Sequence, residues 1–202
     1  MNPGPTSGRV YEELRQRVTG RQLLPGDHLD PAALASALAA STTPVREALS
    51  RLVGEGLVET RQGVGFHIPL VDEPSVRDLY GWIGDLAALA LRTQPDPHQL
   101  VHAASVEHAS YAEQSAATFL GISVASGNHE HAAAMRRANA RLHGIRLGET
   151  EILVDVNPEL DTLRAAMRSS APPSELRRLC TAFVRRRQRA AADLVRRRYR
   201  GA

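Results

Sequence analysis

An amphipathic helix with a marked start, at residues 42–55, constrains the fold of this chain more than any other segment. Thr43 is expected to cap the helix with its hydroxyl, and Pro44 suits the first helical position, where no N–H is needed. Arg46 and Arg51 lie off the apolar face, and Arg46 falls in the first turn, where a helix that reads the DNA major groove carries its contacts. The alternative is an ordinary amphipathic helix with solvated arginines. The apolar face consists of Val45, Leu49, Leu52 and Val53.

The segments on either side favour the DNA-reading interpretation. Residues 7–23 predict a first helix, and the Pro-Gly pair within residues 24–27 predicts a turn. Asp30-Pro31 then predicts the capped start of a second helix. Residues 57–61 and 65–68 alternate like two short strands joined by a glycine-containing turn. Three helices followed by a hairpin make a winged helix-turn-helix, although the hairpin alone could be a plain surface turn.

This pattern resembles the GntR family of bacterial transcriptional regulators. The resemblance implies a dimer that binds a short inverted repeat of double-stranded DNA, with the third helix in the major groove and the wing near the minor groove. Many relatives have an arginine where this chain has Thr42, so one candidate for bidentate guanine contact is lost. The segments that carry the resemblance are Leu24-Pro25-Gly26-Asp27-His28-Leu29, Leu34-Ala35, Thr43-Pro44-Val45-Arg46-Glu47-Ala48-Leu49, Arg51-Leu52, Glu55-Gly56-Leu57-Val58-Glu59 and Gly65-Phe66. The expected DNA-binding residues are Thr42, Thr43, Arg46, Arg51, Arg61, Gly63 and His67.

Composition agrees with a cytoplasmic DNA-binding protein. The chain has 202 residues, a formal net charge of +3 and a single cysteine, Cys180, which excludes an intrachain disulfide. Cys180 lies in an apolar stretch and is expected to be inert core, with redox sensing as the alternative. No apolar run is long enough for a membrane span, and the start shows no signal-peptide pattern. The length allows a DNA-binding domain at 1–70, a linker at 71–74 and a larger domain at 75–202.

The larger domain shows only helical patterns, so the fold class is mainly α. Helices are predicted at residues 75–93, 98–119, 127–147, 150–170 and 173–199, with junctions at 120–126 and 148–149. An antiparallel helical bundle is the natural packing for such a series. The arginine runs at 185–189 and 196–200 are expected to be solvated helix faces, or else to raise nonspecific DNA affinity.

This domain resembles the FCD domain of the FadR-like branch of GntR regulators, more loosely than the first domain resembles its family. The similar residues include Leu79-Tyr80, Leu89-Ala90, Asn139-Ala140-Arg141-Leu142-His143 and the ending 191–197. Many FCD domains bind a divalent metal through one Asp and three His. Here Asn139, His143, Leu176 and Arg198 fall at those places, so the resemblance implies loss of the metal, and we expect no cofactor.

The pocket left behind has two interpretations. It can accept a larger, more apolar small-molecule effector, or it can have filled in. The expected effector-binding residues are Tyr80, Trp82, Asn139, His143 and Arg198, although core packing or a dimer interface would equally explain the aromatic residues.

The sequence thus predicts a transcriptional regulator, a repressor in particular, that binds an inverted-repeat operator as a homodimer formed through the helical domain. It predicts no enzyme, because no nucleophilic triad, P-loop or complete metal cluster is present. The alternative is a metal-dependent or ligand-binding helical protein without regulatory DNA binding.

Overall fold

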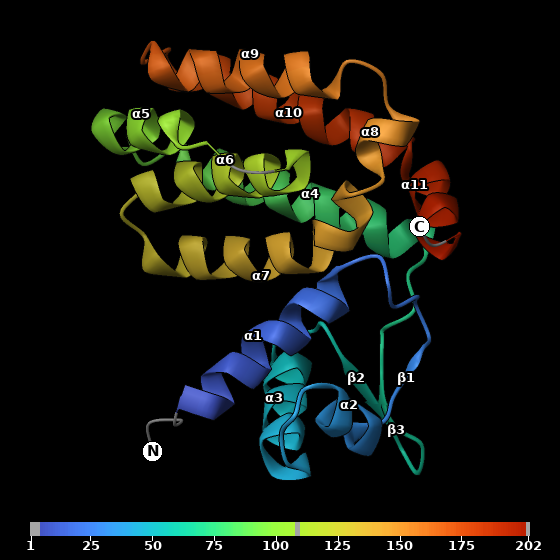
Figure 1. Ribbon diagram of the computed structural model, residues 1–202. Coiled ribbons are helices and arrows are strands. Elements are labelled where there is room, and N and C mark those ends of the chain that lie inside the picture. Colours follow the sequence, from blue (N-terminus) through green and yellow to red (C-terminus); the bar gives the residue numbers. More distant parts are fainter. Residues whose placement is uncertain (1–4, 108–109, 201–202) are drawn as a thin grey trace. The chain divides into compact units, whose positions relative to one another are not determined.

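Three helices and a small antiparallel sheet form the N-terminal part of the computed structural model, which describes residues 5–107 and 110–200 (Figure 1). The strand order is β1-β3-β2, and His67 of β3 pairs with both His28 and Glu59. The hairpin of β2 and β3 follows α3, as a winged helix-turn-helix requires. The elements are α1 (Pro5–Thr19), β1 (His28–Leu29), α2 (Pro31–Ala37), α3 (Thr42–Gly54), β2 (Glu59–Arg61) and β3 (Gly65–His67).

The apolar face predicted for α3 forms the core of this part. α3 packs against both α1 and α2. Val45, Leu49 and Leu52 have no exposed surface. Asp30 caps α2 as predicted, since its carboxylate accepts hydrogen bonds from the backbone N–H groups of Ala32 and Ala33 at 3.0 and 3.4 Å.

Three local expectations were wrong. α3 begins one residue early, with Ser41 as the N-cap and Thr43 inside the first turn, so Thr43 does not cap the helix. α1 ends at Thr19 and not at residue 23, immediately before Gly20, a residue type that favours helix ends. The strand β1 was missed, because two residues are too short to show alternation.

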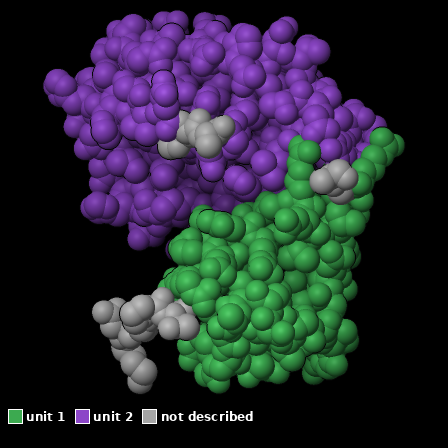
Figure 2. Space-filling view, in the orientation of Figure 1, with its two compact units in different colours: residues 1–71, 198–202 green, residues 72–197 purple. Residues whose placement is uncertain are grey.

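The chain divides into two compact units, residues 1–71 with 198–202 and residues 72–197 (Figure 2). Residues 73 and 74, expected in the linker, already belong to α4, because Asp72 and Ser75 form a reciprocal capping box. The second unit contains α4 (Glu73–Ala90), α5 (Pro97–Ser105), α6 (Tyr111–Ala125), α7 (His129–Arg146), α8 (Glu149–Ile152), α9 (Val156–Arg168), α10 (Pro173–Arg189) and most of α11 (Ala191–Tyr199).

The described part of this second unit is helical, but its elements are more divided than predicted. The helix expected at 98–119 is split, because the backbone becomes extended at Val106 and a second capping box starts α6. That box joins Ser110 and Glu113, and α6 then continues through the expected junction to Ala125. No helix in the described ranges has the length and apolar character of a membrane span.

Two central helices, α4 and α6, organise the second unit (Figure 1). α4 packs against α6, α7 and α10, and α6 packs against α5, α7 and α9. This arrangement brings side chains from helices distant in sequence to one buried place.

Candidate nucleic-acid interface and a buried polar cluster

The first turn of α3 presents an exposed, positively polarised surface. Thr42, Thr43 and Arg46 are exposed, and Arg46 has no ion pair among the described residues. The first turn carries no acidic residue, and the N-cap Ser41 makes no side-chain hydrogen bond to the free N–H groups. A helix N-terminus with free N–H groups and partial positive charge favours phosphate. This end of α3 can therefore accept a phosphate group, and Arg46 is exposed in the same turn.

The other arginine of α3, Arg51, is held against α1. Its guanidinium carbon lies 3.8 Å from the centre of the Tyr11 ring, a cation–π contact. The Tyr11 hydroxyl in turn donates a 2.6 Å hydrogen bond to Glu55. Burial, followed by that hydrogen bond, raises the pKa of Tyr11 to about 12, so Tyr11 stays neutral. Arg51 therefore helps to hold α1 and α3 together, whatever contact its exposed surface makes.

The tip of the wing is a tight glycine turn. The N–H of Val64 donates to the carbonyl of Arg61 at 3.0 Å, and Gly63 has a φ of +74°, which favours glycine. Arg61 is partly exposed and pairs with Glu59 at 2.8 Å. The turn leaves Gly63 and its neighbours exposed, which allows backbone to approach a nucleic acid closely.

His67 does not lie at the wing surface as expected. Only 5% of it is exposed, and its Nδ1 lies 3.3 Å from the carbonyl oxygen of Gly65. Its ring packs against that of His28, with centroids 5.0 Å apart. The assignment of His67 to the DNA contacts is therefore wrong, because burial keeps its ring from phosphate. His28, on the unpredicted β1, is the exposed histidine beside the wing turn.

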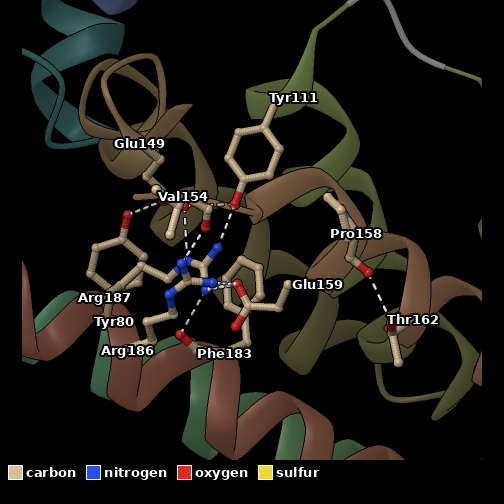
Figure 3. Close-up of polar contacts among 10 residues, drawn as sticks. All are labelled: Tyr80, Tyr111, Glu149, Val154, Pro158, Glu159, Thr162, Phe183, Arg186 and Arg187. Carbon is tan, nitrogen blue, oxygen red and sulfur yellow. Dashed lines mark hydrogen bonds and ion pairs between the residues drawn. The ribbon is translucent and has the colours of Figure 1, made fainter. Parts of the chain in front are cut away.

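A buried ionic cluster joins side chains inside the second unit (Figure 3). Arg187 donates through Nε to Oε2 of Glu149 at 2.8 Å, and neither side chain is exposed. Glu149 also accepts hydrogen bonds from the hydroxyls of Tyr80 and Tyr111, the latter at 2.6 Å. Arg187 donates further to Tyr111 at 2.7 Å and to Glu159 at 2.6 Å. The cluster thus ties α4, α6, α8, α9 and α10 together.

The electrostatics of the cluster fix its protonation. Burial, reinforced by the nearby Glu149 charge, raises the pKa of both Tyr80 and Tyr111, so both phenols are neutral donors. Burial opposes the charge of Arg187, but Glu149, Tyr111 and Glu159 together outweigh it, so the pKa of Arg187 is raised. The arginine run at 185–189 is therefore not a uniformly solvated face: Arg185 and Arg189 are exposed, whereas Arg187 is buried.

The structure brings only some of the expected pocket residues into the helical interior. Tyr80 joins the ionic cluster, and Asn139 is buried on α7, one turn before the half-buried His143. Trp82 is 46% exposed and takes no part in the cluster. Arg198 belongs to the other unit and donates to the carbonyl of Leu23 at 2.8 Å. The structure therefore does not support Trp82 and Arg198 as members of the expected pocket.

Two of the metal-ligand positions implied by the resemblance hold side chains that are poor metal ligands. Leu176 is fully buried in α10, and Arg198 lies in the first unit. Within the described ranges, no group of three or more His, Cys, Asp or Glu residues is placed to hold a metal ion.

The lone cysteine is core, as expected. Cys180 on α10 is 3% exposed, and burial raises the pKa of its thiol to about 12.

The winged arrangement and the exposed start of α3 define a helix-turn-helix DNA-binding domain. Residues 6–68 match the family described as bacterial regulatory proteins, gntR family. The N-terminal domain of this chain is thus a GntR-family helix-turn-helix domain.

Curated relatives share the same part of the chain. An uncharacterized HTH-type transcriptional regulator in an unstable DNA locus of Streptomyces ambofaciens is 41% identical over 76 residues, which cover 37% of this chain and 32% of the relative. The Nta operon transcriptional regulator of Aminobacter aminovorans is 39% identical over 56 residues, covering 28% and 27%. The chain thus spans about a third of the length of these relatives, which are named as regulators and not as enzymes.

Solved structures share the fold over nearly the whole chain. A GntR transcriptional regulator from Rhodococcus sp. RHA1 has a TM-score of 0.74 at 14% identity, covering 92% of this chain and 96% of that one. E. coli McbR/YncC has a TM-score of 0.65 at 19% identity, covering 98% and 100%. The two-unit, mainly helical fold is therefore shared with solved proteins, although the identity is too low to carry function.

Proposed function

We propose that this protein is a transcriptional regulator, a repressor in particular, that binds an inverted-repeat operator. The carrying observation is the exposed first turn of α3, with Thr42, Thr43 and Arg46, in a GntR-family domain. Arg46 is the candidate for bidentate contact to guanine in the major groove. Thr42 and Thr43 are candidates for phosphate or base-edge contacts. Arg51, which is exposed at the flank of α3, remains a candidate for a DNA contact. Arg61 and Gly63 are candidates for DNA contacts from the wing.

The operator is proposed to be read by a homodimer formed through the second unit. One short recognition helix reads too few base pairs for specificity, and a two-fold dimer doubles the site. The exposed face of α4 supports this arrangement, because it carries two large apolar residues. Trp82 is 46% exposed and Leu89 is 41% exposed, and seven residues of spacing place them on the same side of the helix. A second copy of α4 is the proposed occupant of this face.

Regulation is proposed to come from a small-molecule effector bound in the second unit, in a domain of the FCD type. Tyr80, Asn139 and His143 remain candidates for its binding. Support comes from the polar residues gathered inside the helical unit, where an apolar core would suffice for folding. Such a regulator acts where the DNA is, so we propose a cytoplasmic location.

Promoter binding tests this proposal. The full-length protein is mixed with labelled DNA from the promoter region of its own gene, in the presence of excess unrelated DNA. A retarded complex that is competed by unlabelled promoter DNA, and not by unrelated DNA of equal length, is expected. Equal competition by both DNAs would contradict sequence-specific regulation.

A further inference from the structure

Two opposite charges on α3, Arg51 and Glu55, are placed to pair with each other, yet they do not. They lie four residues apart, a spacing at which an arginine and a glutamate on one helix commonly form an ion pair. Glu55 is the C-cap residue of α3 and keeps helical backbone angles, so the spacing holds. In the described chain each charge has a different partner, and both partners are parts of one residue, Tyr11 of α1.

Tyr11 holds the two charges with two different parts of its side chain. The guanidinium carbon of Arg51 lies 3.8 Å from the centre of the ring, over its face. The hydroxyl donates a 2.6 Å hydrogen bond to Oε1 of Glu55, and a bond to a carboxylate is among the stronger kinds. Only 8% of Tyr11 is exposed, and α1 packs against α3, so the ring is fixed. Tyr11 therefore keeps the cation and the anion of α3 apart.

Stacking on Tyr11 leaves the donors of Arg51 available. All five N–H groups of an arginine lie in the plane of the guanidinium, so a ring that covers one face leaves the edges uncovered. Arg51 is exposed and donates no hydrogen bond to any residue that the structure describes. The contact also restricts a flexible side chain before a ligand arrives, which lowers the entropy cost of binding. A fixed guanidinium edge suits a phosphate, which accepts two parallel N–H bonds.

We infer that Tyr11 is a positioning residue for DNA binding, which keeps Arg51 away from Glu55 so that the guanidinium can hold a phosphate of the DNA backbone. This inference rests on the proposed binding of DNA by α3. Arg51 lies in the last turn of α3, whereas base edges are read from the first residues of a recognition helix. A contact from this end therefore goes to the backbone, where it sets affinity and orientation but carries no sequence information.

The Tyr11 hydroxyl is decisive because of what Glu55 does without it. A carboxylate that loses its donor seeks another, and Arg51 is the cation at helical spacing from Glu55. The resulting pair cancels the positive charge that a phosphate needs, and the carboxylate repels the phosphate as well. Removal of one oxygen from a buried side chain on α1 should therefore weaken DNA binding by α3.

DNA binding by the full-length protein at several salt concentrations tests the inference. Fluorescence anisotropy is measured with promoter DNA and with an unrelated duplex of equal length. Tyr11→Phe keeps the ring and should lower the affinity about three- to tenfold, as expected for one lost hydrogen-bonded contact. The loss should be similar on both duplexes, because a phosphate contact acts on every sequence. The slope of log affinity against log salt should shrink by about 0.9, the value for one phosphate.

A second substitution separates positioning from packing. Glu55→Gln keeps the shape of the side chain but removes the charge that would capture Arg51. The double variant Tyr11→Phe with Glu55→Gln should therefore regain most of the affinity and of the salt slope. The control combines Tyr11→Phe with Glu12→Gln, which removes an exposed negative charge from α1, and it should regain neither. A loss caused by poorer packing of α1 would persist in both double variants.

Equal affinity of Tyr11→Phe and the unaltered protein, or a loss that Glu55→Gln does not restore, would overturn the inference. If thermal unfolding shows that Tyr11→Phe does not fold, Arg51→Met tests the phosphate contact directly, and an unchanged salt slope in that variant overturns it. Equal binding of promoter and unrelated DNA contradicts the proposed function instead. It leaves this test in force, because phosphate contacts are measured on either duplex.

Discussion

Glu149 and Arg187 form an ion pair of 2.8 Å although neither side chain has any exposed surface. The two residues come from α8 and α10, and the pair is completed by the hydroxyls of Tyr80 and Tyr111. A buried pair of this kind contributes little net stability relative to an apolar substitute, but removing one partner leaves the other charge uncompensated. The stability of the second unit therefore depends on the pair being intact.

Replacing Arg187 with methionine should destabilise the second unit strongly. The variant leaves Glu149 buried without its cation, for which a cost of about 3–5 kcal/mol is typical. Urea unfolding followed by far-ultraviolet circular dichroism measures the change. As a control, Asp193→Asn removes the acid of an exposed pair with Arg196 and should cost no more than about 1 kcal/mol. Equal, small effects in both variants would contradict the role assigned to the buried pair.

Local signals in the sequence predicted the first unit well. The Asp30-Pro31 cap, the apolar face of α3 and the glycine turn of the wing each depend on neighbouring residues, and the structure shows all three. His67 was misplaced because strand alternation does not say which face is covered. Its burial depends on β1, and a strand of two residues is too short for its sequence to predict it.

The second unit shows the opposite case. Arg146, Glu149 and Arg187 look like ordinary surface charges in sequence, since such residues are rarely buried. Their burial follows from the packing of helices that lie far apart in the sequence. No local sequence pattern predicts such packing. The capping box at Ser110 and Glu113 was a readable signal for the break before α6, and the expected helix at 98–119 passed over it.

The thiol of Cys180 should be nearly unreactive in the folded protein. Burial raises its pKa from 9.0 to about 12, which lowers the thiolate fraction near neutral pH about 1,000-fold. Reaction with Ellman's reagent at pH 8 should be slow in buffer and fast in denaturant. Fast reaction of the folded protein would show that the thiol is accessible and support redox sensing instead.

The raised pKa of Cys180 also predicts a loss of stability at high pH. Because the pKa of Cys180 is higher in the folded protein than in the unfolded chain, its contribution is complete below pH 9.0 and lost as pH rises toward about 12. Cys180→Ala should show a smaller decline in the free energy of unfolding over this interval, relative to its own value at pH 8. An identical decline in both proteins would assign the effect to other groups, such as the buried tyrosines.

Arg46→Ala should weaken specific DNA binding by about tenfold or more. A bidentate arginine–guanine contact is worth about 1–3 kcal/mol, and the side chain of Arg46 is exposed, so its removal should leave the fold intact. Fluorescence anisotropy with promoter DNA measures the affinity. Arg137→Ala removes the same charge from the exposed side of α7 and serves as the control. If the affinity fell equally in the two variants, Arg46 would contribute only nonspecific positive charge and no specific base contact.

The apolar face of α4 gives a prediction about assembly. Leu89→Glu should convert a dimer into a monomer, because it places a charge within the proposed contact. Sedimentation at micromolar concentration measures the change, and Glu130→Gln, exposed on α7, is the control. A monomer in the unaltered protein, independent of concentration, would contradict the dimer itself.

Footprinting on the promoter DNA tests the central claim most directly. A dimer that presents two α3 helices should protect two half-sites of an inverted repeat, about one helical turn apart between centres, on the same face of the duplex. Protection of both half-sites at the same protein concentration, lost together in Arg46→Ala, is the predicted result. Protection without two-fold symmetry, or no protection at concentrations that retard the DNA, would contradict the account of a dimeric, sequence-specific regulator.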